Sequence, residues 1–160
     1  MLEQYLFVFF VAMVPVIELR GAIPIGLGLG LDVLPTYIVA VAGNMLPVPI
    51  IYLFARKFLI WGYHKPLIGG ICKFFVAKGE KAGRAREAKA GRGLVAALLI
   101  FVGIPLPGTG AWTGTLAGSI LDMKFKDVLV ACMGGVLLAG VIIGLASAGL
   151  LGAFSALFAV

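Results

Sequence analysis

PVIELRGAIPIG at residues 15–26 and GIPLPGTG at residues 103–110 are the two stretches that decide the fold of this chain. Each ends an apolar run, 5–17 in the first case and 94–106 in the second, that is too short to cross a membrane, because a spanning helix needs about 20 apolar residues. Another short apolar piece follows each break, and we expect the first break to lie at residues 18–24. Half-helix, break, half-helix is the pattern of a re-entrant hairpin, which is tolerated at membrane depth only where protein buries it or where it lines a wet cavity.

The composition excludes a soluble domain. Of the 160 residues, 62% are hydrophobic and 12% are charged, whereas a soluble domain carries about 25% charged residues. The 23 glycines suit close helix packing and broken helices in a membrane. The first five residues carry an acid and no base, unlike the start of a cleavable signal peptide. We therefore expect a single membrane domain over residues 1–160.

Two longer apolar runs complete the predicted architecture. Residues 33–55 and the run that starts near Val128 are each long enough to span, so a spanning helix follows each hairpin. The predicted fold is an all-α integral membrane protein with two inverted halves, 1–55 and 93–160. Each half is a re-entrant helical hairpin plus a transmembrane helix, and a basic helical connector at residues 56–92 joins them. Short interrupted apolar segments at matching places in two halves are typical of a transport site.

The distribution of basic residues agrees with this topology. If each hairpin returns to the side it entered, residues 56–92 and 122–127 share one side of the membrane, and twelve of the thirteen Lys and Arg residues lie there. The positive-inside rule makes that side cytoplasmic and places both termini outside. A basic connector could bind nucleic acid, but contact with anionic lipid headgroups explains it better, since each base contributes about 1 kcal/mol near such a surface.

Glu18 and Arg20 are the candidate functional pair. They are the only ionisable side chains between Glu3 and Asp32, and they lie at the predicted tip of the first hairpin. A charge at the bilayer centre costs at least about 2.5 kcal/mol, so such groups commonly mark a substrate or proton path and are paired. Glu18 can bind a cation or carry a proton, and Arg20 can hold a phosphate or carboxylate or neutralise Glu18. The alternative is a structural ion pair that fixes the hairpin tip.

The remaining candidates surround the breaks. Prolines free backbone carbonyls and helix N-termini that can bind ions or headgroups, although they also shape turns that hold no ligand. Asn44 is a lone amide within a spanning helix, for which a helix–helix hydrogen bond is favoured over a substrate contact. The full set of substrate- or proton-binding candidates is Glu18, Arg20, Gly21, Pro24, Asn44, Pro105, Pro107, Thr109, Trp112 and Thr113.

The sequence contains few residues that could carry out catalysis. It contains no Ser/His/Asp set, metal-ligand cluster or paired carboxylate motif, and its single histidine, His64, lies in the connector. We therefore expect no catalytic residue, no metal and no cofactor.

The two stretches resemble the small multidrug export protein family of prokaryotic membrane proteins. A Glu-x-Arg-Gly-x-x-Pro hairpin paired with a Pro-x-Pro-Gly-Thr-Gly hairpin carries the resemblance, which runs over most of the chain. It implies a transporter of the prokaryotic inner membrane with Glu18 and Arg20 as the central polar pair, and with Pro24, Pro105 and Pro107 as the hairpin breaks.

The layout also resembles, more remotely, the DedA-like membrane proteins. Those have two re-entrant hairpins in inverted halves and are associated with proton-linked handling of lipids, including polyprenyl-phosphate carriers. This chain is shorter and lacks a clear run of paired arginines just after the first hairpin.

These observations predict a proton-coupled secondary transporter for an amphiphilic or lipid-like substrate, either a drug-type cation or a lipid phosphate. Two spanning helices and two hairpins make a small enclosure, so we expect a homodimer or a larger homo-oligomer. The alternative from another class is a non-transporting membrane scaffold or lipid-organising protein, in which Glu18 and Arg20 only hold the hairpin. An ion channel ranks last, because the sequence contains no ring of carboxylates or filter-like repeat.

Overall fold

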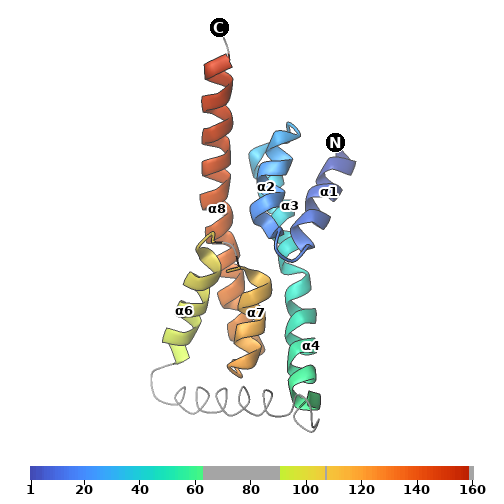
Figure 1. Ribbon diagram of the computed structural model, residues 1–160, viewed down its shortest axis with the longest axis vertical. Coiled ribbons are helices and arrows are strands. Elements are labelled where there is room, and N and C mark those ends of the chain that lie inside the picture. Colours follow the sequence, from blue (N-terminus) through green and yellow to red (C-terminus); the bar gives the residue numbers. More distant parts are fainter. Residues whose placement is uncertain (63–90, 107, 159–160) are drawn as a thin grey trace.

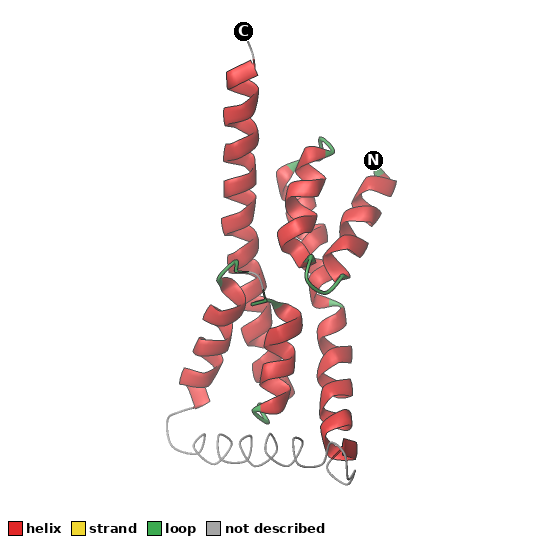
Figure 2. Ribbon diagram, viewed as in Figure 1, coloured by secondary structure: helices red, strands yellow, loops and turns green. Residues whose placement is uncertain are grey.

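The structure is a computed structural model that describes residues 1–62, 91–106 and 108–158. The regular secondary structure in these ranges is α-helical, and no strand occurs in them (Figure 1, Figure 2). The all-α fold class predicted from the sequence is therefore confirmed for the described part of the chain. Most of the predicted connector, 56–92, lies outside the described residues.

The first break lies earlier in the chain than the sequence predicts. Helix α1 (Leu2–Met13) ends at Val14, which has φ −71° and ψ 126°, because the ring of Pro15 excludes the preceding residue from the helical region. Val16 has a φ of 80°, a left-handed value that is rare for a β-branched residue. Helix α2 (Glu18–Gly28) then begins. The break occupies residues 14–17, and the expectation of a break at 18–24 is wrong.

Helices α3 (Val33–Met45) and α4 (Pro47–Gly62) together provide the first candidate membrane span. Only Leu46 separates them. The helix is interrupted there because Pro47 has no backbone N–H to continue the helical hydrogen bonds. Residues Val33–Ala55 still form one apolar segment of 23 residues. The spanning helix predicted at 33–55 is present, with this interruption at its middle.

Helices α6 (Gly91–Gly103), α7 (Ala111–Ile120) and α8 (Phe125–Phe158) form the second half of the chain. The break between α6 and α7 falls within the proline- and glycine-rich stretch, as predicted. Gly108 has a φ of 84° there, which glycine adopts without steric cost. Helix α8 contains the second candidate span, Phe125–Leu150, of 26 residues. In the described chain, these two spans are the ones long and apolar enough to cross a membrane.

Helices α2 and α3 pack along one part of α8, α6 and α7 pack along another, and the two groups meet near its middle, while α4 lies beside α7 (Figure 1). On one part, Gly140 lies against Leu19 and Tyr37, and the Tyr37 hydroxyl donates to the Leu137 carbonyl over 3.1 Å. On the other part, Gly135 lies against Val102 of α6. The α1–α2 turn and the α6–α7 turn therefore face each other at mid-level. The start of α1 and the end of α8 lie at one end of the molecule, and the end of α4 and the start of α6 lie at the other (Figure 1).

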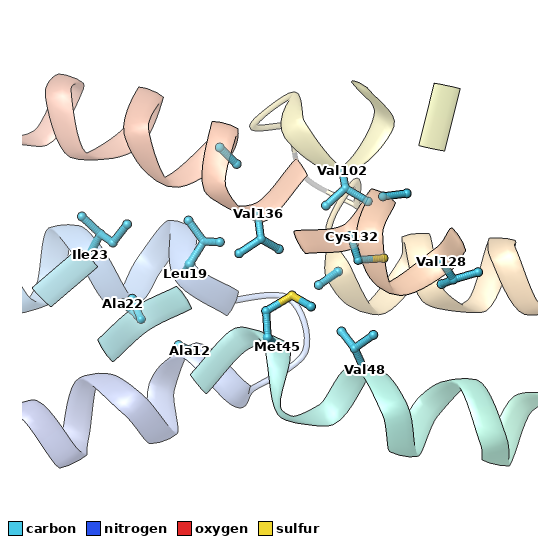
Figure 3. Packing of buried hydrophobic residues seen from close by; sticks show 14 of the residues in the cluster. Ala12, Leu19, Ala22, Ile23, Met45, Val48, Val102, Val128, Cys132 and Val136 are labelled. Atoms are coloured by element: carbon cyan, nitrogen blue, oxygen red, sulfur yellow. The ribbon is translucent and has the colours of Figure 1, made fainter. Parts of the chain in front are cut away.

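A continuous apolar core crosses the level where the halves meet. Figure 3 shows Met45, Val102, Cys132 and Val136 gathered there from α3, α6 and α8, and all four are buried. The outward faces are also apolar, which suits lipid and not water. Large exposed hydrophobic residues include Leu6, Phe10, Ile50, Leu53, Val130, Val141 and Leu145.

Candidate functional site

Glu18 lies at the start of α2 and reaches across to the second hairpin. Its side chain is 5% exposed, and Oε1 accepts a hydrogen bond of 3.2 Å from the backbone N–H of Trp112 in the first turn of α7. The partial positive charge at a helix N-terminus favours a carboxylate in this position. The backbone of Glu18 has a φ of 51°, a left-handed conformation that costs on the order of 1–3 kcal/mol and persists only where the surroundings hold it.

Gly110 makes room for this carboxylate. It precedes α7, and a Cβ atom added there would overlap the Glu18 carboxyl group. Any side chain at this position would therefore displace Glu18 from the helix N-terminus. Gly110 is not among the site residues predicted from the sequence, although its Gly-x-Gly spacing with Gly108 is visible in the second break.

Arg20, two residues further along α2, reaches the turn between α6 and α7. Its guanidinium donates to the carbonyl of Leu106, to the carbonyl of Ile104 over 3.2 Å, and to Thr109 Oγ1 over 3.0 Å. The two carbonyls lie in the break after α6, where the Leu106 N–H also donates to the Ile104 carbonyl over 2.8 Å and the Thr109 N–H to the Leu106 carbonyl over 3.2 Å. Three acceptors thus converge on one planar group, a geometry that suits arginine and not lysine.

Thr109, Trp112 and Thr113 hold the second turn in shape. Thr109 Oγ1 lies 2.7 Å from the Ile104 carbonyl and 2.9 Å from the Leu106 carbonyl. Trp112 Nε1 donates to the Met13 carbonyl at the end of α1 over 3.2 Å, and Thr113 Oγ1 accepts from the Gly110 N–H over 2.9 Å. The structure therefore brings these three predicted residues together with Glu18 and Arg20.

The described residues do not form the expected direct ion pair between Glu18 and Arg20. Each of the two side chains bonds instead to the α6–α7 turn or to α7, and they reach different groups there. The two charges therefore join the hairpins to each other and do not merely close the tip of one hairpin.

The other predicted candidates are placed differently. Pro24 lies inside α2 on an exposed position and does not form the break. Gly21 is in α2, where an added Cβ would overlap Ile17 of the preceding turn. Pro105 is exposed in the second break, and Pro107 lies outside the described residues.

Asn44 and Thr36 are buried polar side chains of α3 without hydrogen-bond partners in the described structure. Asn44 is 1% exposed and Thr36 is fully buried, yet neither amide atom of Asn44 nor the Thr36 hydroxyl has a partner. The helix–helix hydrogen bond expected for Asn44 is not formed. Thr36 was not selected from the sequence, where a threonine in an apolar span is unremarkable because it can bond its own helix.

The comparisons with known proteins identify the family. The family model described as "Putative small multi-drug export protein" matches residues 18–142, a segment that begins at Glu18 and includes Arg20 and the whole of the second turn. No match was found among curated proteins or among solved structures. The matched segment covers most of the 160 residues, and the helices are apolar as a membrane protein requires. The chain therefore belongs to the small multidrug export protein family.

Proposed function

We propose that this protein is a proton-coupled secondary transporter whose two halves are inverted re-entrant hairpins, each followed by a spanning helix. The lengths of the helices support this architecture. Helices α1, α2, α6 and α7 have 12, 11, 13 and 10 residues, or roughly 15–20 Å at 1.5 Å per residue. A hydrocarbon core is about 30 Å thick, so each of these helices reaches about its middle and the two turns meet there.

The orientation is part of the same proposal. The end of α4 and the start of α6 lie at one end of the molecule (Figure 1). Twelve of the thirteen basic residues belong to the sequence segments 56–92 and 122–127, which the proposed topology puts on that side. That end would face the cytoplasm of a prokaryotic cell, where the basic connector would contact anionic headgroups, and both termini would lie outside.

One observation carries the transport proposal: Glu18 and Arg20 of one hairpin hold the turn of the other. Protonation of Glu18 would remove the charge that the N-terminus of α7 stabilises, and this contact between the halves would weaken. Separation of the turns would then open the site to one side of the membrane. A drug-type cation would bind Glu18 in exchange for that proton, once the carboxyl group ionises again, or a lipid phosphate would bind Arg20. The apolar outer faces suit a substrate that arrives from the lipid.

Ligand binding can be tested by thermal unfolding of the purified protein in detergent, with ethidium as the cationic amphiphile and farnesyl phosphate as the lipid phosphate. A ligand that binds only the folded protein stabilises it and so raises Tm. At a ligand concentration of a hundred times Kd, the stabilisation is about 2.7 kcal/mol. We expect an ethidium shift that disappears in Glu18→Gln, or a farnesyl phosphate shift that disappears in Arg20→Ala.

Transport itself is tested with the ligand that shifts Tm, supplied to proteoliposomes with and without an imposed pH gradient. The expected result is uptake that depends on the gradient and is lost in Glu18→Gln. Full uptake by folded Glu18→Gln and Arg20→Ala proteins would contradict the proposal.

The rival function, a non-transporting scaffold, predicts that the meeting point of the turns stays dry. A cysteine at Leu106, which is 56% exposed in the second turn, tests this in a Cys72→Ser, Cys132→Ala background. In lipid nanodiscs we expect Leu106→Cys to react with a charged methanethiosulfonate, because only a hydrated thiol forms the reactive thiolate. Leu145→Cys, 72% exposed on α8, is the lipid-facing control. If neither cysteine reacted with the reagent, the scaffold function would be favoured.

A homo-oligomer belongs to the proposal because non-helical backbone cannot face lipid. The first turn exposes Val16 almost fully, at 97%, so a second copy would cover it. Cross-linking of Val16→Cys in the same cysteine-free background should give a dimer on a denaturing gel, whereas a solely monomeric product would count against this contact.

A further inference from the structure

Two rows of small or polar residues face each other on α2 and α3. On α2 the row is Glu18, Ala22 and Gly26, and on α3 it is Thr36, Ala40 and Asn44, all of them buried. Residues spaced by four lie on one face of a helix. A Cβ added to Gly26 would lie 2.5 Å from Thr36 Cγ2 and 3.0 Å from Val8 Cγ2 of α1, so this face of α2 packs against α3 and α1.

The contact between Gly26 and Thr36 fixes the register of the two rows. The short turn at residues 29–32 makes α2 and α3 antiparallel, so four steps back along α2 correspond to four steps forward along α3. Ala22 then lies at the level of Ala40, and Glu18 lies at the level of Asn44. The unpartnered amide of Asn44 is thus at the depth of the carboxylate that reaches α7.

The polar atoms of the α3 row need a partner that the described protein does not supply. A buried polar group without a hydrogen bond is costly, and few native groups remain so. Water can satisfy a hydroxyl and both atoms of an amide, because it donates and accepts. The second half of the chain is different: Thr115 and Ser119 of α7 are equally buried, but they bond the carbonyls of Ala111 and Tyr52. The unsatisfied groups are therefore a feature of the α2–α3 seam.

We propose that the seam between the rows 18/22/26 and 36/40/44 takes up a chain of water molecules that carries protons to Glu18 from the end of the molecule where the termini lie. Thr36 would bind the water nearest that end of the molecule, and Asn44 would bind the water nearest Glu18. Eight helical residues separate Thr36 from Asn44, about 12 Å, which on the order of four hydrogen-bonded waters would span. Alanine and glycine between these two levels leave room for water once α2 and α3 separate slightly. This inference rests on the proposed proton coupling and names its route.

Hydration of the seam is tested with cysteines in lipid nanodiscs, in the Cys72→Ser, Cys132→Ala background. Thr36→Cys keeps a similar side-chain volume, and Ala40→Cys lies deeper in the row. The control is Ile38→Cys, 56% exposed on the outer face of the same helix. With 2-aminoethyl methanethiosulfonate we expect both seam positions to react at least about tenfold faster than Ile38→Cys, since a thiol in lipid stays protonated. Rates at or below that control in proteins with normal melts would overturn the hydrated seam.

Proton delivery is tested separately by using Trp112 as the reporter. Its backbone N–H bonds Glu18, and Trp61→Phe leaves it as the sole tryptophan of the chain. A stopped-flow pH jump should change its fluorescence, and Glu18→Gln should abolish that change. We expect Thr36→Val and Asn44→Leu to slow the response about fivefold, the effect of one lost hydrogen bond on a rate, with the same final amplitude. Thr115→Val, which removes a partnered hydroxyl, is the matched control and should leave the rate unchanged.

The outcomes separate this inference from the proposed function. A Glu18-dependent response with an unchanged rate in Thr36→Val and Asn44→Leu overturns the seam but leaves proton coupling intact. Reactive seam cysteines together with a Trp112 signal that ignores pH overturn the route and the coupling, and leave only a hydrated seam. Slowed responses and reactive cysteines together support the proposal even if the substrate of transport is different from the two classes named above.

Discussion

At the scale of single residues, the contact of Glu18 with the second hairpin depends on a glycine, which has no side chain. Gly110 leaves the space that the Glu18 carboxylate fills, and the first turn of α7 then binds that carboxylate. The contact is a charge against a helix N-terminus inside an apolar protein, where few other groups could replace it.

Gly110→Ala should therefore destabilise the protein, because its methyl group would displace the buried carboxylate. We expect a loss of about 1–3 kcal/mol, typical of overpacking, measured as a lower Tm in detergent. Gly93→Ala is the matched control, since nothing lies within 4 Å of a Cβ added there; alanine in a helix is favoured by roughly 0.5–1 kcal/mol over glycine. Adding Glu18→Ala should relieve much of the Gly110→Ala effect, and strictly additive losses would refute the contact.

Arg20→Lys is expected to fail as a conservative replacement. Arginine reaches the carbonyls of Ile104 and Leu106 and the Thr109 hydroxyl together, whereas an ammonium group cannot match this planar arrangement. Losing charge-assisted hydrogen bonds should lower stability by about 1.5–3 kcal/mol, measured by chemical unfolding. A lysine variant with wild-type stability would show that position 20 needs only a positive charge.

The sequence indicates the two charges but not their partners. Glu18 and Arg20 stand out because ionisable groups are rare in an apolar segment. Their partners are mainly backbone groups, the carbonyls of Ile104 and Leu106 that accept from Arg20 and the N–H of Trp112 that donates to Glu18. Any residue carries these groups, so no residue pattern reveals them. The left-handed backbone conformation of Glu18 cannot be predicted from the sequence either, since glutamate is not a residue type that favours it.

At the scale of helices, prolines end some elements and are tolerated in others. Pro15 ends α1 and Pro47 interrupts the α3–α4 pair, but Pro24 stays inside α2. The difference explains why the second break was predicted correctly and the first was placed too late. The second stretch combines prolines with Gly108 and Gly110, whereas the first break contains no glycine and relies on Val16 in a strained conformation.

Helix packing in the second half should depend on Gly135. A Cβ there would lie 2.6 Å from Val102 Cβ and 2.8 Å from the Leu99 carbonyl oxygen, and backbone cannot move aside cheaply. We expect Gly135→Ala to lower stability by about 1–3 kcal/mol or more, and the folded yield from detergent extraction to fall. Gly144→Ala on the same helix has open space around the added Cβ, so its melt should be unchanged or slightly higher.

At the scale of the whole molecule, the proposed arrangement fixes where the termini lie. An alkaline phosphatase fusion, which is active only outside the cytoplasm, should be active at the C-terminus and at the N-terminus behind a signal sequence. A green fluorescent protein fusion should fluoresce only when placed within residues 63–90. This expectation follows from the twelve basic residues in the sequence segments 56–92 and 122–127, which the proposed topology places on the cytoplasmic side. Fluorescence of a C-terminal fusion, together with an active N-terminal phosphatase fusion, would show that one hairpin crosses the membrane completely.

The contacts of Arg20 also set an order of events during synthesis. Its acceptors follow 84 to 89 residues later in the chain, so a ribosome that adds about 5–20 residues per second makes them roughly 4–18 s after Arg20. For that interval the guanidinium of the nascent first hairpin lacks the three acceptors that it has in the folded protein. Chains truncated before residue 104 should therefore be cleared by quality-control proteases, and the hairpin should settle in the bilayer only once translation has passed the second turn.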